Sequence, residues 1–150
     1  MVYYLKTKDQ YKIALKQYLA WAETQTQKKL RILHSDRGGK YINHKVKDIL
    51  NQRGIEHHLT MPHTPQQNGK AEWFNRTIME KAMAMLHGAG LSNGFWEYTV
   101  HTVVHIYNRT PFRGLQWHTL HETWDSGHVP DISYFCVFSC KAYMHVHKDE

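Results

Sequence analysis

Two acidic residues, Asp36 and Glu72, stand in settings that suit a shared catalytic site. Asp36 follows a short apolar run and precedes the pair Gly38-Gly39, a pattern typical of a turn at the end of a strand. Glu72 lies in the expected first turn of an amphipathic helix, and 35 residues (37–71) separate the two acids. If folding brings the two carboxylates together, they can bind divalent metal ions that hold the attacking and leaving oxygens of a phosphoryl transfer.

Each acid taken alone also has an ordinary structural explanation. Glu72 can complement the positive N-terminal end of its helix, or pair with Arg76 one turn further on. Asp36 can cap a turn, and most charged residues at such positions are simply solvated. It is the ordered combination of strand, acid, glycine pair, helix, strand, proline-containing loop and acid that favours a shared site.

Apolar spacing indicates the elements that would position these acids. It predicts helices at about 7–24, 46–53, 68–87 and 92–108, and strands at about 30–35 and 55–59. The helix–strand–helix–strand order implies parallel strands joined by crossover helices, hence an α/β fold. Gly54 is expected just after the second helix, in the position typical of a C′ glycine.

The two ends of the chain carry weaker patterns. Residues 2–5 read as an internal strand at the very start, which suggests that the first part of the domain is absent. Beyond residue 112, the segments 137–138 and 142–144 suggest a hairpin or an extended tail. The expected apolar face of the third helix consists of Ala71, Phe74, Ile78, Ala82 and Met85.

Composition narrows the class of protein. With 150 residues and 41% hydrophobic residues the chain is long and apolar enough for a globular domain. A formal charge of +6 fits a polyanionic partner, and no apolar run approaches the length of a membrane span. Cys136 and Cys140 are expected to be buried thiols in a reducing compartment.

Histidine and tryptophan are also prominent, but their spacing favours structure over chemistry. The spacing of the 13 histidines, with or without the cysteines, matches no usual zinc signature, so core or surface histidines are expected. Along its strand, His57 is expected on the inward side and His58 on the opposite side. The tryptophans at 21, 96, 117 and 124 are expected to be core or interface anchors rather than base-stacking platforms.

The two acidic segments and their surroundings resemble the catalytic core of retroviral-type integrases, most closely those of Copia (Ty1) long-terminal-repeat retrotransposons. Residues 35–39 resemble the second-aspartate motif of that family, and residues 64–72, continuing through 75–77, resemble its glutamate motif. The 35-residue gap is the family's D-x35-E spacing. Further similar segments lie at 54–57, 95–96, 108–111 and 137–140, so the resemblance covers nearly the whole chain.

The resemblance implies an RNase H-like mixed sheet flanked by helices, lacking its first strand or strands, with a C-terminal helix and an extended tail. It implies a core at 1–111 and a Copia-type extension at 112–150. Asp36 and Glu72 would be the second and third acids of a D,D-E triad that binds Mg²⁺ or Mn²⁺. The implied reaction is DNA integration, in which 3′ ends of donor DNA are trimmed and then joined to target DNA.

Candidate nucleic-acid contacts follow from the same resemblance. They surround Glu72 and comprise Gln67, Asn68, Lys70, Asn75 and Arg76. Asn68, Asn75 and Arg76 would contact or organise DNA ends, with phosphate contact as the expected role of Arg76, and Gln67 lies in a loop that can follow the DNA backbone. Lys81 on the same helix reads as an ordinary solvated lysine. The implied partners are element and target DNA, with RNA as an alternative, and a second copy of this chain; the implied location is the nucleus.

Departures from the family pattern point to an incomplete enzyme. No residue fills the role of the first aspartate, and the zinc module that precedes the family's core is missing. Arg37 and Lys40 place cations beside the presumed metal site, and Trp73 replaces a common arginine. These features predict weak metal binding and little or no strand transfer by the isolated chain.

The sequence leaves three other interpretations of the chain open. The chain can be a non-catalytic remnant that binds DNA or RNA through its basic surface. It can be a ribonuclease of the same fold, acting on hybrid duplexes. It can also be an unstable relic, because loss of a first strand would expose a sheet edge and remove part of the core.

Overall fold

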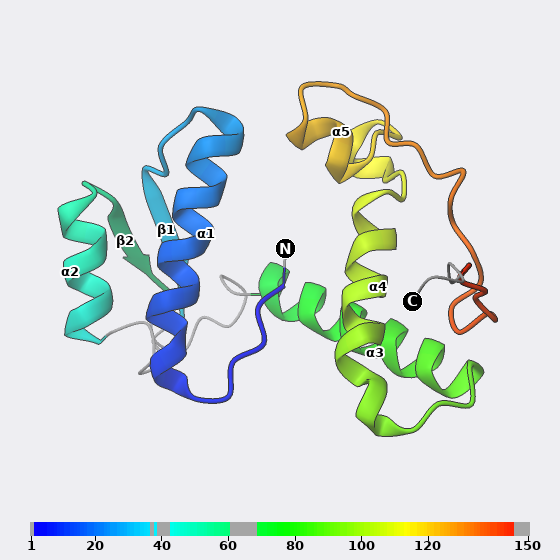
Figure 1. Cartoon of the computed structure of the whole chain (residues 1–150). Helices are drawn as coiled ribbons and strands as arrows, with labels where there is room; N and C mark the ends of the chain where they lie inside the picture. Colours follow the sequence, from blue (N-terminus) through cyan, green and yellow to red (C-terminus); the bar gives the residue numbers. More distant parts are fainter. Residues whose placement is uncertain (1, 37, 39–42, 61–68, 146–150) are drawn as a thin grey trace. The chain divides into compact units, whose positions relative to one another are not determined.

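A computed structural model describes residues 2–36, 38, 43–60 and 69–145 of the chain (Figure 1). Its contacts divide the chain into two compact units, Met1–Ile78 and Met79–Glu150. The division falls inside one long helix, α3 (Gly69–Gly88). The proposed division into a core at 1–111 and an extension at 112–150 stays a prediction.

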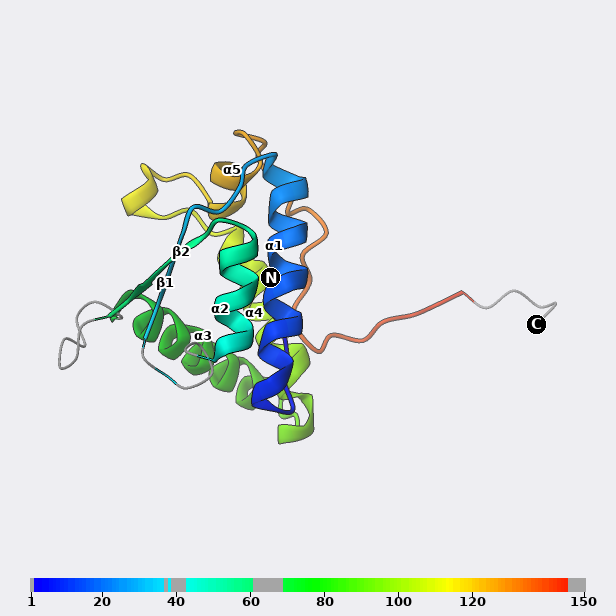
Figure 2. The same cartoon turned by 90° about the vertical axis from the view of Figure 1, so that its left-hand side faces the viewer.

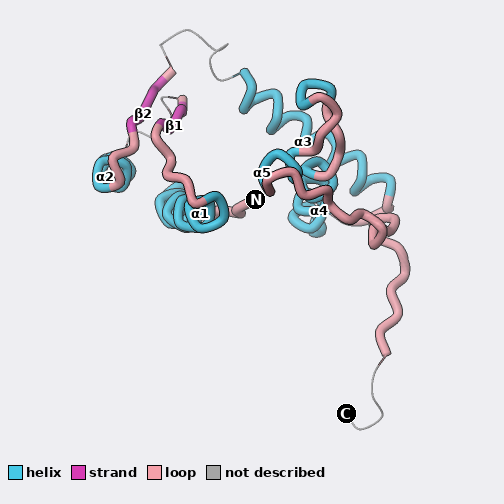
Figure 3. The backbone as a smooth tube through the Cα atoms, turned by 90° about the horizontal axis from the view of Figure 1, so that it is seen from above, coloured by secondary structure: helices cyan, strands magenta, loops and turns pink. Residues whose placement is uncertain are grey.

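The first unit is built on two parallel strands, β1 (Ile32–Ser35) and β2 (Glu56–Leu59). Helix α1 (Tyr11–Thr26) precedes β1, and helix α2 (His44–Gln52) connects the strands. Figures 2 and 3 show both helices on the same face of the strand pair. This arrangement confirms the α/β class and the parallel pairing, and it is compatible with part of an RNase H-like fold.

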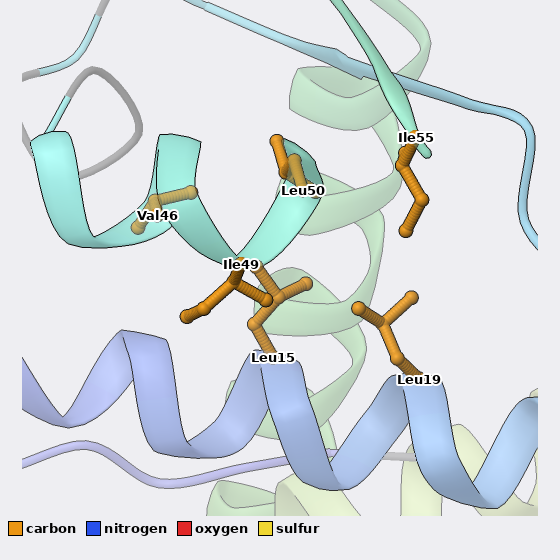
Figure 4. Packing of buried hydrophobic residues seen from close by; sticks show 6 residues of the cluster. All are labelled: Leu15, Leu19, Val46, Ile49, Leu50 and Ile55. Atoms are coloured by element: carbon orange, nitrogen blue, oxygen red, sulfur yellow. The ribbon is translucent and has the colours of Figure 1, made fainter. Parts of the chain in front are cut away.

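The core of this unit lies between the two helices and the strands. Its buried members are all aliphatic (Figure 4): Leu15, Leu19, Val46, Ile49, Leu50 and Ile55. Tyr11, Leu30 and Leu33 pack against them from the edge. On α2 the buried positions 46, 49 and 50 follow helical spacing, because residues three and four apart share one face of a helix.

Gly54 ends the turn after α2 as expected, with a φ of +66°. A Cβ at this position would meet no atom within 4 Å, so a side chain is disfavoured only by the left-handed backbone. We therefore expect Gly54→Ala to lower the free energy of unfolding by about 1–2 kcal/mol in urea titrations. Gly88→Ala is the matched control, because Gly88 is helical and equally open; a comparable loss there would contradict this explanation.

The second unit contains the end of α3, helix α4 (Trp96–Asn108) and helix α5 (Leu120–Trp124). One short 3₁₀ turn precedes α4 at Asn93–Phe95, and another follows α4 at Arg113–Leu115. In the first unit, a similar turn precedes α1 at Lys8–Gln10. The buried face of α4 consists of Thr99, Val100, Val103, Val104 and Tyr107. Thr119 caps α5 by accepting from the backbone N–H of Glu122, whose side chain accepts from Thr119 in return. No helix in the described parts of the chain is long and apolar enough to cross a membrane.

Several sequence-based expectations differ from the structure. Residues 2–5 and 137–144 form no strand within the described chain, so the initial strand and the hairpin are wrong, while the extended tail is confirmed. On α3, Ile78 and Ala82 are buried as expected, but Leu86 takes the place of Met85, and Ala71 is exposed.

The expected burial of the thiols is also wrong. Cys136 and Cys140 are both exposed, since they lie in the extended tail, where the chain folds no element over them. Trp96, Trp117 and Trp124 are exposed as well, so they are not core anchors, and their role as interface anchors stays a prediction. Trp21 is partly buried and makes a tilted ring contact with Tyr18 at 6.1 Å.

Candidate functional site

Asp36 lies directly beyond the carboxyl end of β1. Ser35 is the last residue of β1 and pairs with Leu59 of β2, and the backbone N–H of Thr60 donates to the Ser35 carbonyl at 3.0 Å. The carboxyl ends of both parallel strands therefore meet at one edge, and Asp36 is the first residue to leave it. In open α/β sheets this edge is where ligands commonly bind.

Two hydrogen bonds hold Asp36 and its peptide in place. The backbone N–H of Gly38 donates to Asp36 Oδ1 at 2.9 Å, and the Ser35 hydroxyl donates to the Asp36 carbonyl at 3.0 Å. The first bond forms a tight Asp turn, the local role that an isolated aspartate in this setting can fill.

His57 supports the same edge from β2. Its Nε2 lies 2.8 Å from the Ser35 hydroxyl oxygen. Because the single hydroxyl proton of Ser35 is directed to the Asp36 carbonyl, the oxygen accepts from His57, so Nε2 carries the proton. Burial, followed by the charge of His58, lowers the pKa of His57, which favours this neutral form. His57 is partly buried and His58 exposed, as their alternation along the strand predicts.

Glu72 lies in the first turn of α3 and is exposed. Asn75 and Arg76 follow at three and four residues, so they share the helical face of Glu72. Lys70 is also exposed, but two residues away it projects from a different side of the helix. The structure thus groups Asn75 and Arg76 with Glu72 and separates Lys70 from them.

The remaining predicted contacts, Gln67 and Asn68, lie outside the described residues, as do Arg37 and Lys40. The segment 61–68 that joins β2 to α3 also lies outside them. The position of Asp36 is therefore described relative to β1 and β2, and that of Glu72 within α3. The convergence of the two carboxylates stays a prediction.

The described residues fit a divalent metal ion in ligand type but not in ligand number. Carboxylate oxygens are the ligands that Mg²⁺ prefers, and Asp36 Oδ1 already accepts from Gly38. In the described ranges no group of three or more His, Cys, Asp or Glu side chains is placed to hold a metal ion.

The structure reveals a basic groove that sequence reasoning missed. The groove, of about 310 Å³, lies between α1 and α2 and is lined by Lys12, Ile13, Lys16, Lys45, Asp48, Ile49 and Gln52. Three lysines and one aspartate are among these residues, so the lining carries a net positive charge. The four-residue spacing of Lys12 and Lys16 is a signal visible in the sequence, but the contribution of α2 requires the fold.

Comparison with known proteins relates the chain to one kind of protein. It is 40% identical over 149 residues to a retrovirus-related Pol polyprotein from transposon TNT 1-94 of Nicotiana tabacum, covering 99% of this chain and 11% of that protein. It is 32% and 30% identical over 142 residues to the corresponding Pol polyproteins from transposons RE2 and RE1 of Arabidopsis thaliana, covering 95% of this chain and 10% of each. No family model matches.

These relatives are much longer than the chain, which spans about a tenth of their length. Because the similarity runs along nearly all of this chain, the relationship concerns one segment of those polyproteins. The chain is therefore a relative of a segment of retrotransposon Pol polyproteins.

Proposed function

We propose that this relative of a transposon Pol segment is part of an integrase catalytic core and serves DNA integration by polynucleotidyl transfer. The observation that carries the proposal is the position of Asp36 at the shared carboxyl edge of β1 and β2. Two further observations support the integrase reading. A second carboxylate, Glu72, lies in the first turn of α3, and the chain is similar to a segment of a retrovirus-related Pol polyprotein. Asp36 and Glu72 are the proposed catalytic pair, with Mg²⁺ or Mn²⁺ as a weakly bound cofactor.

The proposed partner is nucleic acid, with donor and target DNA first and RNA as an alternative. Asn75 and Arg76 lie beside Glu72 on α3, so a strand that approaches this face can contact all three. Lys70, Gln67 and Asn68 complete the proposed contact set. Phosphate contacts of this kind supply affinity that is independent of sequence and falls with salt. Nuclear location and assembly with a second copy are further parts of the proposal.

The isolated chain is expected to bind DNA but to join donor to target DNA at background level in Mg²⁺ or Mn²⁺. The physical reason is that the described residues offer too few metal ligands for a metal pair. A strand-transfer assay with labelled donor ends measures the joining, and Asp36→Asn with Glu72→Gln gives the matched inactive control. Joining well above that control would contradict the expected inactivity and support a complete site.

A second candidate function is nucleic-acid binding without catalysis. The basic groove between α1 and α2 favours this function, because its lining includes neither Asp36 nor Glu72 and can bind phosphates without them. In this case, DNA affinity would be unchanged by Glu72→Gln and by chelators, and charge removal at Lys12 and Lys16 would weaken it. Loss of affinity on chelation would instead favour the metal-dependent integrase proposal.

A further inference from the structure

Two hydrogen bonds in series connect β2 to the peptide group that follows β1. His57 Nε2 lies 2.8 Å from the Ser35 hydroxyl oxygen, and that hydroxyl donates to the Asp36 carbonyl oxygen at 3.0 Å. His57 and Ser35 are 22 residues apart in the sequence and meet because the strands pair, with Leu33 opposite His57 and Ser35 opposite Leu59. A side chain of one strand is thereby connected to the backbone that leaves the other.

The Asp36 carbonyl belongs to the peptide group that lies within the Asp turn. In this turn the backbone N–H of Gly38 donates to Asp36 Oδ1 at 2.9 Å. The ring closed by that bond includes the Cα–C bond of Asp36, and rotation about this bond moves the carbonyl relative to the carboxylate. A hydroxyl that holds the carbonyl therefore restricts the turn and, through it, the direction of the carboxylate.

The Ser35 hydroxyl has a choice of acceptors that His57 decides. It carries a single proton, which can serve either the Asp36 carbonyl or an accepting nitrogen of His57. A proton on His57 Nε2 removes the second choice and leaves the hydroxyl proton for Asp36. Ser35 is only 9% exposed and His57 is partly buried, so water competes little for these groups, and bonds in series also polarise one another.

We propose that His57 is a positioning residue for Asp36 and acts through the Ser35 hydroxyl. His57 donates to the hydroxyl oxygen, the hydroxyl holds the Asp36 carbonyl, and the carbonyl keeps the turn closed around the carboxylate. Strand β2 thus sets the direction in which an acid of β1 points. The consequence for metal binding rests on the proposed function, in which Asp36 holds Mg²⁺ or Mn²⁺.

Exchange of the Gly38 amide proton with water, measured by NMR on the full chain, reports the Asp turn without metal or DNA. The shorter amide of His57→Asn cannot reach the place of Nε2, so exchange should become about two- to tenfold faster. His57→Gln can donate from nearly the place of Nε2 and should restore the wild-type rate. His58→Asn, on the opposite side of β2, is the matched control and should leave the rate unchanged.

Ser35→Ala tests whether His57 acts through the hydroxyl, and it removes a single oxygen atom. Alone it should accelerate Gly38 exchange about as much as His57→Asn does, and the double variant should exchange no faster than Ser35→Ala. A merely structural contribution of His57 to the sheet would add to that of Ser35→Ala. Additive effects, or a wild-type rate in His57→Asn or Ser35→Ala, in variants that circular dichroism shows to be folded, would overturn the proposal.

The tautomer of His57 provides a test on the unaltered chain. Nitrogen NMR should show the proton on Nε2; a proton on Nδ1 would contradict the proposal, because Nε2 would then accept the hydroxyl proton of Ser35.

Titration of the same sample with Mn²⁺ separates this role from the proposed function. Paramagnetic broadening of resonances near Asp36 that Asp36→Asn abolishes would support metal binding. No broadening, with Gly38 exchange responding as expected, would refute Asp36 as a metal ligand and still support its positioning by His57.

Discussion

Leu19→Ala is expected to lower the free energy of unfolding of the helix–sheet unit by roughly 2–5 kcal/mol. Leu19 is only 1% exposed and belongs to the aliphatic cluster that joins α1 to α2 and to Ile55 just before β2, with Leu33 of β1 packed against it. Truncation removes apolar burial and leaves a cavity, because the neighbours come from three different elements and can close in only partly. Urea titration followed by circular dichroism measures the change.

Ile13→Ala, in the same helix, is the matched control for this prediction. Ile13 is 52% exposed, so its truncation removes little buried area and is expected to change stability by about 0.5 kcal/mol or less. Equal losses at the two positions would show that the packing between α1 and α2 does not stabilise the unit. A cooperative transition in the wild-type chain would also argue against the reading of an unstable relic.

The second large effect is expected from removal of two cations on α3. Combining Lys70→Gln with Arg76→Gln should weaken DNA binding for all sequences alike and flatten its salt dependence. If both contact phosphates, the slope of log K against log salt should decrease by about one unit for each. Fluorescence anisotropy with a labelled duplex at several salt concentrations measures both quantities.

Lys81→Gln provides the control on the same helix. The Lys81 ammonium lies 5.2 Å from the centroid of the Tyr107 ring in the second unit, so it already has an intramolecular partner. Its removal should leave the salt slope near the wild-type value. A loss equal to that of the double variant would mean that net charge alone governs binding, which would remove the special role proposed for Lys70 and Arg76.

Most of the local structure was predictable, because it depends on neighbours along the chain. The order of helices and strands follows from apolar periods of 3.6 and 2, and α3 begins and ends close to its expected limits. Gly54 adopts the positive φ expected after a short helix. Glu72 falls in the first turn of α3 for the same reason, since Gly69 begins that helix.

Predictions that needed a partner from elsewhere in the chain were the ones that failed. Residues 2–5 have strand-like composition but do not pair with β1 or β2. Cys140 lies in the segment 137–140 that resembles a packed part of the Copia-type pattern, yet the tail that carries it runs outside any core. Burial and pairing are decided by which segments meet, and composition along one segment does not report this.

The order of residues along the chain sets which side chains are available for chemistry and which elements carry them: an acid after a strand, another in the first turn of a helix, and cations nearby. Which of these side chains meet depends on how the elements pack in space. It joined His57 to Ser35 at the edge beside Asp36, drew lysines from α1 and α2 into one groove, and placed Tyr134 on His105. The physical reason is that local periodicity acts over a few residues, whereas each of these contacts joins segments more than twenty residues apart.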